Sequence, residues 1–138
     1  MLSNPNFILK TASAKILWEC VDTSTLVINL ENGSYYSLEQ SASILWKLLL
    51  AGYSPNQIAE QASIKYDLDR QSTLGEILQW CESLILEGLM ISDSQESGAR
   101  LTLDELVLTE YVKPELKKYT DLETLLLADP IHEFQSRD

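Results

Sequence analysis

Two runs of β-forming residues flank an Asn-Gly pair at positions 32 and 33, and this arrangement predicts a β-hairpin. The runs are Thr25–Leu30 and Tyr35–Leu38. Asn and Gly both tolerate the positive φ angles of the two-residue turn that joins antiparallel strands. With this pair as the loop, we expect Leu30 to face Tyr35 across the ladder. The second arm is short, which places it at an edge of the sheet.

Further strand-like runs precede the hairpin. Lys15–Cys20 mixes β-branched, aromatic and polar residues, and Phe7–Leu9 is a shorter run of the same kind. We therefore expect a three-stranded antiparallel sheet in the first forty residues, to which Phe7–Leu9 adds one short strand.

After this sheet the hydrophobic period becomes helical. Ser37–Gln40 has the sequence of a capping box, and a helix that begins there ends at Gly52. A second capping box at Ser54–Gln57, with proline at the first helical position, begins a second helix. A third helix is predicted over Ser72–Glu87, where Gly88 ends it.

The third helix carries one apolar stripe that predicts its buried face. Trp80 lies about 100° from the centre of this stripe, so we expect it on the flank of the helix rather than in the deepest core. The stripe consists of Leu74, Ile77, Leu78, Cys81, Leu84 and Ile85.

Charge restricts the partners of the chain. Its 138 residues suit one domain with an appendage, and a hydrophobic content of 45% is enough for a core. The net charge of −11 disfavours nucleic acid and anionic membranes. The N-terminus lacks the features of a signal peptide, and Lys47 interrupts the longest apolar run. We therefore expect a cytoplasmic protein without a membrane span.

Residues for catalysis or metal binding are scarce. Cys20 and Cys81 lie far apart in sequence and are interpreted as free thiols, and His132 is the only imidazole. No glycine-rich phosphate loop and no nucleophile motif is present. We therefore expect no enzyme activity, no catalytic residues, no cofactor and no metal.

Composition divides the chain into three parts. Residues 1–91 contain the predicted strands and helices, and residues 92–110 begin with small and polar residues typical of a linker. Residues 111–138 have scattered leucines, which are too few to form a core alone and so need a surface to bind.

Three strands followed by three helices is an α+β arrangement of the winged helix-turn-helix type. A winged helix often binds DNA, but the third helix carries Glu76, Glu82 and Glu87 and has no basic residue after Arg70. DNA binding is therefore disfavoured. A non-catalytic structural or regulatory protein, with its C-terminal segment as an oligomerisation arm, remains an alternative.

The order and spacing of residues over Lys15–Ile91 resemble the PqqD-like family, the recognition elements of ribosomally synthesised, post-translationally modified peptides (RiPPs). The resemblance implies a peptide chaperone that holds the leader of a precursor peptide as an added edge strand beside the third helix. It is carried by Asp22–Leu30, Asn32–Leu38, Ala42, Ile44, Trp46, Gly52–Ser54, Ile58, Tyr66–Asp67 and Leu84–Leu89.

The resemblance also implies a peptide-binding groove between the hairpin and the third helix. One of the two tyrosines of the hairpin is expected in the core and the other at the peptide, and the sequence leaves open which is which. Trp80 is the candidate groove wall, or else packs on the flank of its helix. The candidate groove residues are Ser34, Tyr35, Tyr36, Ser37, Leu74, Ile77, Trp80, Cys81 and Leu84.

The C-terminal segment resembles the leader consensus of lasso-peptide precursors. Tyr111, Pro114, Leu116 and Leu122 match its Tyr-x-x-Pro pattern and following leucines, whereas Thr120 replaces a glycine. The residues after Leu127 lack the start and acid spacing of a lasso ring, so the resemblance implies leader-like binding rather than a lasso product. We expect this fused leader to dock in its own chain or to be exchanged within a homodimer.

The expected partners follow from the resemblance. They are a precursor leader peptide, in cis or in trans, and a maturation enzyme, namely a leader peptidase, a cyclase or a radical SAM enzyme. Lys113, Lys117 and Lys118 of the tail are candidates to meet the glutamates of the third helix, with each exposed pair worth under about 1 kcal/mol.

Overall fold

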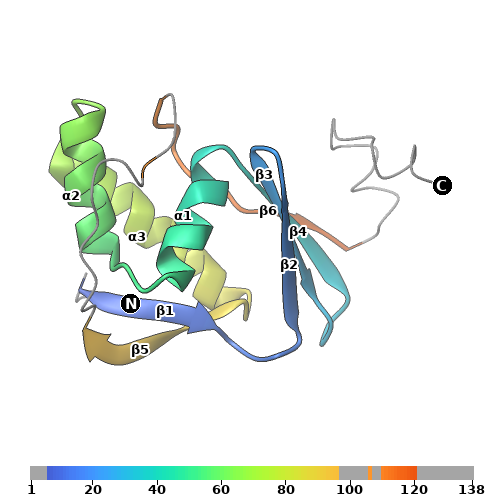
Figure 1. Ribbon diagram of the computed structural model, residues 1–138. Helices are drawn as coiled ribbons and strands as arrows, with labels where there is room; N and C mark the ends of the chain where they lie inside the picture. Colours follow the sequence, from blue (N-terminus) through green and yellow to red (C-terminus); the bar gives the residue numbers. More distant parts are fainter. Residues whose placement is uncertain (1–5, 97–105, 107–109, 121–138) are drawn as a thin grey trace.

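The computed structural model describes residues 6–96, 106 and 110–120, and Figure 1 shows how the elements are arranged. The chain is an α+β protein with three helices and antiparallel strands. The helices lie in the corner between a four-stranded sheet and a two-stranded ribbon (Figure 1). Residues 110–120 are called the tail segment below.

The larger sheet has the order β2-β3-β4-β6. Its first three strands are antiparallel neighbours in sequence: β2 (Ile16–Val21), β3 (Ser24–Asn29) and β4 (Ser34–Glu39). The fourth strand, β6 (Lys117–Tyr119), comes from the tail segment and pairs antiparallel with β4.

The predicted hairpin exists, but its register differs from the prediction by two residues. Ile28 rather than Leu30 pairs with Tyr35. The connection is therefore four residues long, because the Gly33 N–H donates to the Asn29 carbonyl and closes a wider turn. A shift of two residues keeps every side chain on its expected face of the sheet.

The smaller ribbon pairs β1 (Phe7–Thr11) with β5 (Met90–Glu96). The prediction of a linker from residue 92 onward is therefore wrong for Ser92–Glu96, which continue a strand. Polar residues suit this position because the ribbon has two strands only, and Ile91 and Ser92 are exposed. Both ends of the N-terminal part of the chain thus meet in one ribbon.

The helices are α1 (Ser41–Leu50), α2 (Pro55–Lys65) and α3 (Arg70–Leu86). The capping box of α2 is present as predicted, since the Gln57 N–H donates to Ser54 Oγ and the Gln57 side chain accepts from the Ser54 N–H. Helix α3 begins two residues earlier than predicted, because the Asp69 carboxylate accepts the Ser72 N–H. Gly52 and Gly88 follow the ends of α1 and α3 with positive φ.

The predicted capping box at Ser37–Gln40 is wrong. The ladder of β4 with β3 continues through Leu38 and Glu39, and these pairings keep Ser37 in a strand. Helix α1 instead follows Gln40, which has φ 55° and makes no side-chain cap. The N–H of Gln40 donates to the Thr23 carbonyl and fixes the corner between sheet and helix.

The core lies between the helices and the inner face of the sheet. Helix α1 contributes Trp46 and Leu49, and both are fully buried. Val27 of β3 and Tyr36 of β4 meet them from the sheet, and Leu106, from the chain after β5, is also buried. The core therefore includes one residue from beyond the N-terminal part of the chain.

Candidate peptide-binding site

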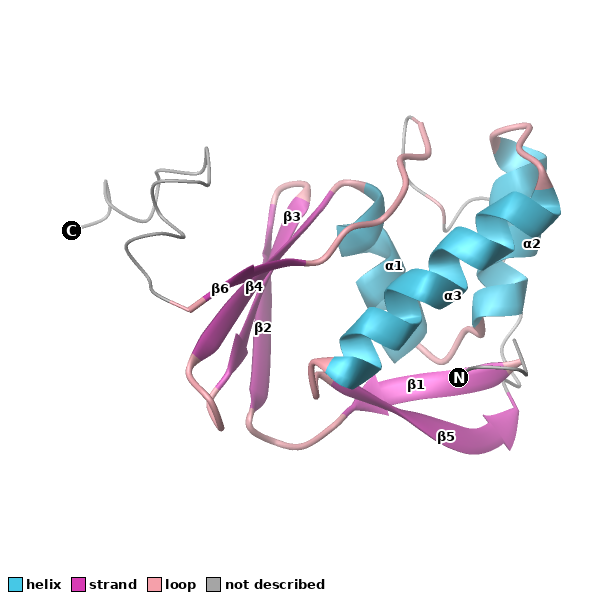
Figure 2. Cartoon of the chain, turned by 180° about the vertical axis from the view of Figure 1, so that it is seen from behind, coloured by secondary structure: helices cyan, strands magenta, loops and turns pink. Residues whose placement is uncertain are grey.

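The edge of β4 is occupied by the tail segment. Tyr35, Tyr36 and Ser37 pair with Tyr119, Lys118 and Lys117 respectively. Figure 2 shows the tail segment coming from the side of the helices and joining the sheet as β6. A three-residue strand has little stability alone, so its pairing depends on the contacts that the rest of the segment makes.

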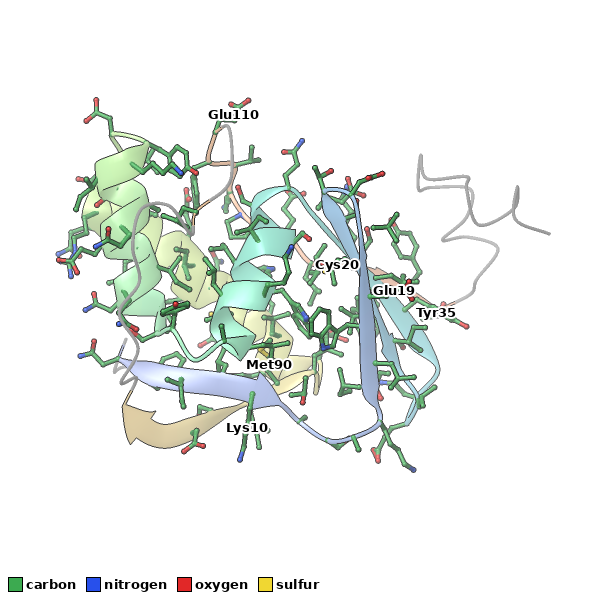
Figure 3. The ribbon with its side chains drawn as sticks, viewed as in Figure 1. Lys10, Glu19, Cys20, Tyr35, Met90 and Glu110 are labelled. Atoms are coloured by element: carbon green, nitrogen blue, oxygen red, sulfur yellow. The ribbon has the colours of Figure 1, made fainter. Side chains whose placement is uncertain are left out.

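The two tyrosines of β4 lie on opposite faces of the sheet. Tyr36 is fully buried and faces the helices. Tyr35 is half-buried, and Figure 3 shows it on the side of the sheet away from the helices. The question that the sequence leaves open is therefore answered in one respect: Tyr36 is the core residue.

On the outer face, one row of side chains crosses all four strands. It runs from Leu17 through Ile28 and Tyr35 to Tyr119. Leu17 is 47% exposed, and the other three are half-buried. The last member of this row belongs to the tail segment.

A cleft of about 510 Å³, here called the α3 cleft, lies between α3 and the tail segment. One face of the helix forms its wall, since the helical residues recur at spacings of three and four. The wall is lined by Glu76, Gln79, Trp80, Ser83 and Glu87, and the tail segment contributes residues 113–118.

Tyr111 anchors the tail segment at the N-terminal half of α3. Its Oη donates to Glu76 Oε1 at 3.0 Å. Burial raises the pKa of Tyr111 strongly, and the hydrogen bond to the Glu76 carboxylate raises this pKa further. The phenol therefore stays protonated and keeps its proton available for the carboxylate.

Backbone and apolar contacts continue along the segment. The Val112 N–H donates to Ser41 Oγ at 2.7 Å, at the start of α1. Pro114 is buried, and Leu116 packs against the hydrophobic core. Proline has no N–H to donate, and here it precedes the paired residues of β6, where no ladder bond is lost.

Glu87 joins three elements at the C-terminal end of α3. Its Oε1 accepts from Tyr36 Oη at 2.9 Å and pairs with Lys118 Nζ at 3.0 Å. The bond to Lys118 and, next, the bond from Tyr36 lower the pKa of Glu87. The same carboxylate raises the pKa of Lys118, whereas burial is the main cause that raises the pKa of Tyr36. These pKa shifts keep the Glu87 carboxylate ionised, the Lys118 amine protonated and the Tyr36 hydroxyl protonated, and these are the forms that make the contacts.

Leu106 is an anchor of the chain between β5 and the tail segment. Its side chain is 1% exposed, and its carbonyl accepts from Tyr66 Oη at 3.2 Å and from Lys65 Nζ. The end of α2 thus holds the chain shortly before the tail segment begins. The scattered leucines of this region were the only sequence signal for such an anchor.

The predicted groove residues of α3 separate into two groups. Ile77, Cys81 and Leu84 are fully buried in the core, and Leu74 is half-buried against it, so none of the four lines the α3 cleft. Their side chains belong to the helix layer of the core in this structure, and their role in a peptide-binding groove stays a prediction. Burial raises the pKa of the Cys81 thiol to about 12, which keeps it protonated.

Trp80 lines the α3 cleft, as proposed for a groove wall. It is also 3% exposed and belongs to the core, so the expectation of a flank position is wrong. Its indole N–H has no hydrogen-bond partner among the described atoms.

Sequence reasoning missed the polar half of the cleft. Gln79 and Ser83 were not singled out, and Glu76 and Glu87 were considered only as partners of the tail lysines and not as lining residues of a groove. Their common spacing on α3, next to a predicted groove, was the available signal. Ser34 is buried but lies outside the pairing with β6, whereas Ser37 is paired and lines a smaller cleft with Val112.

Other predictions concern the remaining chemistry of the chain. Cys20 and Cys81 are free thiols. Within the described ranges, no group of His, Cys, Asp or Glu side chains is arranged to hold a metal ion, and no helix is long and apolar enough to cross a bilayer. Leu122 and His132 lie outside the described residues.

Residues 24–90 match the family model of PqqD, described as Coenzyme PQQ synthesis protein D. This part of the chain is PqqD-like. The match ends at Met90, so the tail segment lies outside the family match. No curated protein matches the chain significantly.

Two solved structures share the fold of this PqqD-like part of the chain. TbiB1 in complex with the TbiA(beta) leader peptide is 22% identical, with a TM-score of 0.56, over 62% of this chain and 99% of that chain. A lasso peptide synthetase B1 complexed with the leader peptide is 23% identical, with a TM-score of 0.54, over 62% and 98%. The chain described here is therefore longer than these two.

Proposed function

We propose that this chain is a RiPP recognition element that binds the leader of a precursor peptide by strand addition to β4, beside α3. It is a binding module without catalysis of its own. It presents the peptide to a maturation enzyme, which is a leader peptidase, a cyclase or a radical SAM enzyme. Its two free thiols suit the reducing cytoplasm.

The observation that carries this proposal is the occupied edge of β4. A segment with the sequence pattern of a leader pairs with Tyr35–Ser37 and places Tyr111 and Pro114 against the helices. Main-chain bonds of an added strand supply affinity without regard to sequence, while pockets for side chains supply specificity. The two solved relatives of this fold were determined with leader peptides, which supports the same role for this edge.

The tail segment is, in this proposal, a fused leader that occupies the site of its own chain or of a second copy. Tyr111, Pro114 and Leu116 provide the apolar contacts, each worth up to about 2 kcal/mol when fully buried. The cost of ordering the segment, about 1–2 kcal/mol per residue, offsets much of this gain. We therefore expect a docked segment that still exchanges with other peptides.

A competition experiment tests the proposal on the full chain. The probe is a fluorescent synthetic peptide of residues 110–120. The double substitution Tyr111→Ala and Pro114→Ala weakens docking of the chain's own segment and should leave the site open. We expect the probe to bind this variant at least about tenfold more tightly than it binds the wild-type chain, whose site is occupied.

Matched probes identify the contacts. A probe with Tyr111→Ala and Pro114→Ala should lose binding, whereas Val112→Ala should have little effect, since the Val112 side chain is 40% exposed and only its N–H is bonded. A circular dichroism melt checks that the chain variant is folded. If none of the probes binds a folded variant at millimolar concentration, the site does not bind peptides and the proposal is overturned.

A further inference from the structure

We propose that Glu87 selects peptides that carry a cationic side chain seven residues after the leader tyrosine. The inference rests on the proposed function, because it names the peptide chemistry that the same site recognises. It goes beyond the tyrosine, proline and leucine of the leader-like pattern, which contain no charged group.

The first argument is that α3 contacts the peptide through two glutamates. Glu76 accepts from the Tyr111 hydroxyl, and Glu87 pairs with the Lys118 ammonium. Eleven residues separate them in sequence, which is about 16 Å along a helix axis. The seven residues from Tyr111 to Lys118 span up to about 23 Å when fully extended, so the peptide must bend between its two contacts.

The second argument is that the carboxylate of Glu87 is also held by a residue of the domain itself, outside the tail segment. Tyr36 is buried in the core and donates its hydroxyl proton to Glu87 Oε1 at 2.9 Å. A carboxylate that already has one fixed donor costs less ordering when a second donor arrives. An exposed pair on two free side chains has no such support, and Glu87 therefore differs from Glu82 on the same helix, for which no contact with the tail segment is found among the described residues.

The third argument comes from the strand register. Lys118 pairs with Tyr36, and its ammonium reaches Glu87 on the helix side of the sheet. Lys117 and Tyr119 point to the opposite face, because side chains alternate along a strand. A slip of one residue would turn the Lys118 ammonium away from Glu87 and would bring Lys117 or Tyr119 opposite Tyr36. The charge contact therefore depends on a cationic side chain at the strand position that pairs with Tyr36.

The test uses the full chain with Tyr111→Ala and Pro114→Ala, whose site is open, and labelled probes of residues 110–120. One probe has the native sequence, and the other carries Lys118→Glu. With Glu87 present, we expect the Lys118→Glu probe to bind about fivefold or more weakly than the native probe. With Glu87→Lys in the chain, the order of the two probes should reverse.

Two controls separate this contact from the general repulsion of acidic peptides by a chain of net charge −11. Glu82→Lys makes the same charge change on the same helix, and it should leave the ratio between the two probes unchanged within about twofold. A probe with Lys117→Glu has the same total charge as the Lys118→Glu probe, and it should lose at most about twofold in affinity.

The outcomes distinguish the two proposals. If the native and Lys118→Glu probes bind equally, or if Glu82→Lys reverses their order as Glu87→Lys does, the selection by Glu87 is overturned while peptide binding stands. If no probe binds a folded chain, the proposed function itself is overturned, and this inference with it.

Discussion

Glu87 is bonded from two strands at once, by Tyr36 of β4 and by Lys118 of β6. Its side chain is 33% exposed and that of Lys118 is 43% exposed, so water weakens the ion pair. The contribution of this residue is therefore to the choice of the added strand more than to the stability of the fold.

Docking of the tail segment should depend on pH through Glu87. Its pKa is lowered in the docked state, so its contribution is complete above the usual glutamate pKa of about 4.3 and is lost as the pH falls through the lowered value. The pKa of Lys118 is raised, so its contribution is complete below about 10.4 and is lost at still higher pH. NMR shifts of the Lys117–Tyr119 amides should therefore show docking unchanged between about pH 6 and 9 and weakened near pH 3.

The Glu87→Gln variant provides the control for this pH dependence. It keeps an acceptor for the Tyr36 hydroxyl but has no charge to lose, so part of the loss of docking in acid should disappear. If the Glu87→Gln variant loses docking at low pH to the same extent as the wild-type chain, other carboxylates cause the loss.

At the scale of the elements, the corner between β4 and α1 is strained at one residue. Gln40 has φ 55° and ψ −118°, a combination that glycine adopts readily and other residues adopt at a cost of about 1–3 kcal/mol. Gln40→Gly should therefore raise the free energy of unfolding by about 1 kcal/mol, once the entropy of glycine is subtracted.

Thermal denaturation monitored by circular dichroism measures this change. Gln61→Gly is the matched control, because Gln61 lies inside α2, where glycine should lower stability by about 1 kcal/mol. Equal losses in both variants would mean that the backbone at Gln40 carries no strain.

The same corner shows which elements were predictable. The capping box at Ser54 was predicted correctly because all of its bonds are local. The capping box at Ser37 was predicted wrongly. Its sequence is a local helix signal, but the strand pairing of Leu38 with Thr25, thirteen residues away, keeps this part of the chain in β4. Local patterns predicted the helices, whereas strand ends depended on partners that no short window contains.

The candidate site was predictable to a similar degree. The Tyr-x-x-Pro pattern indicated the segment that the structure brings to β4, and Trp80 was named as its wall. The apolar stripe of α3 was predicted correctly as its buried face, but four of its members were also named as groove candidates, because periodicity identifies a buried face without saying what covers it. The pair of Lys118 with Glu87 is one of the contacts expected between the tail lysines and the third helix, whereas the bond from Tyr111 to Glu76 was not predicted.

For the whole molecule, the connection between the domain and the tail segment decides whether docking occurs within one chain. Fourteen residues lead from Glu96 to Glu110, a reach of up to about 46 Å. The buried Leu106 lies within this connection and divides it into two shorter parts. A tether of this length gives an effective concentration on the order of millimolar, which favours docking in cis.

A protease site inserted between residues 97 and 105 tests this expectation. The uncut chain should run as a monomer by size-exclusion chromatography at all micromolar concentrations. After cleavage, the C-terminal fragment should dissociate on dilution, since the effective concentration is lost. The uncut insertion variant is the control, and dimers that persist at low micromolar concentration would instead show exchange of the segment between copies.

The row of side chains on the outer face of the sheet has a consequence for any protein that meets this surface. Without a strand paired to β4, the row would end at Tyr35. When β6 is paired to β4, the aromatic ring of Tyr119 extends the row. A peptide-bound domain therefore differs from a peptide-free one on the outer face of its sheet as well as in the α3 cleft. A protein that contacts the outer face of the sheet can therefore distinguish the peptide-bound domain from the peptide-free one.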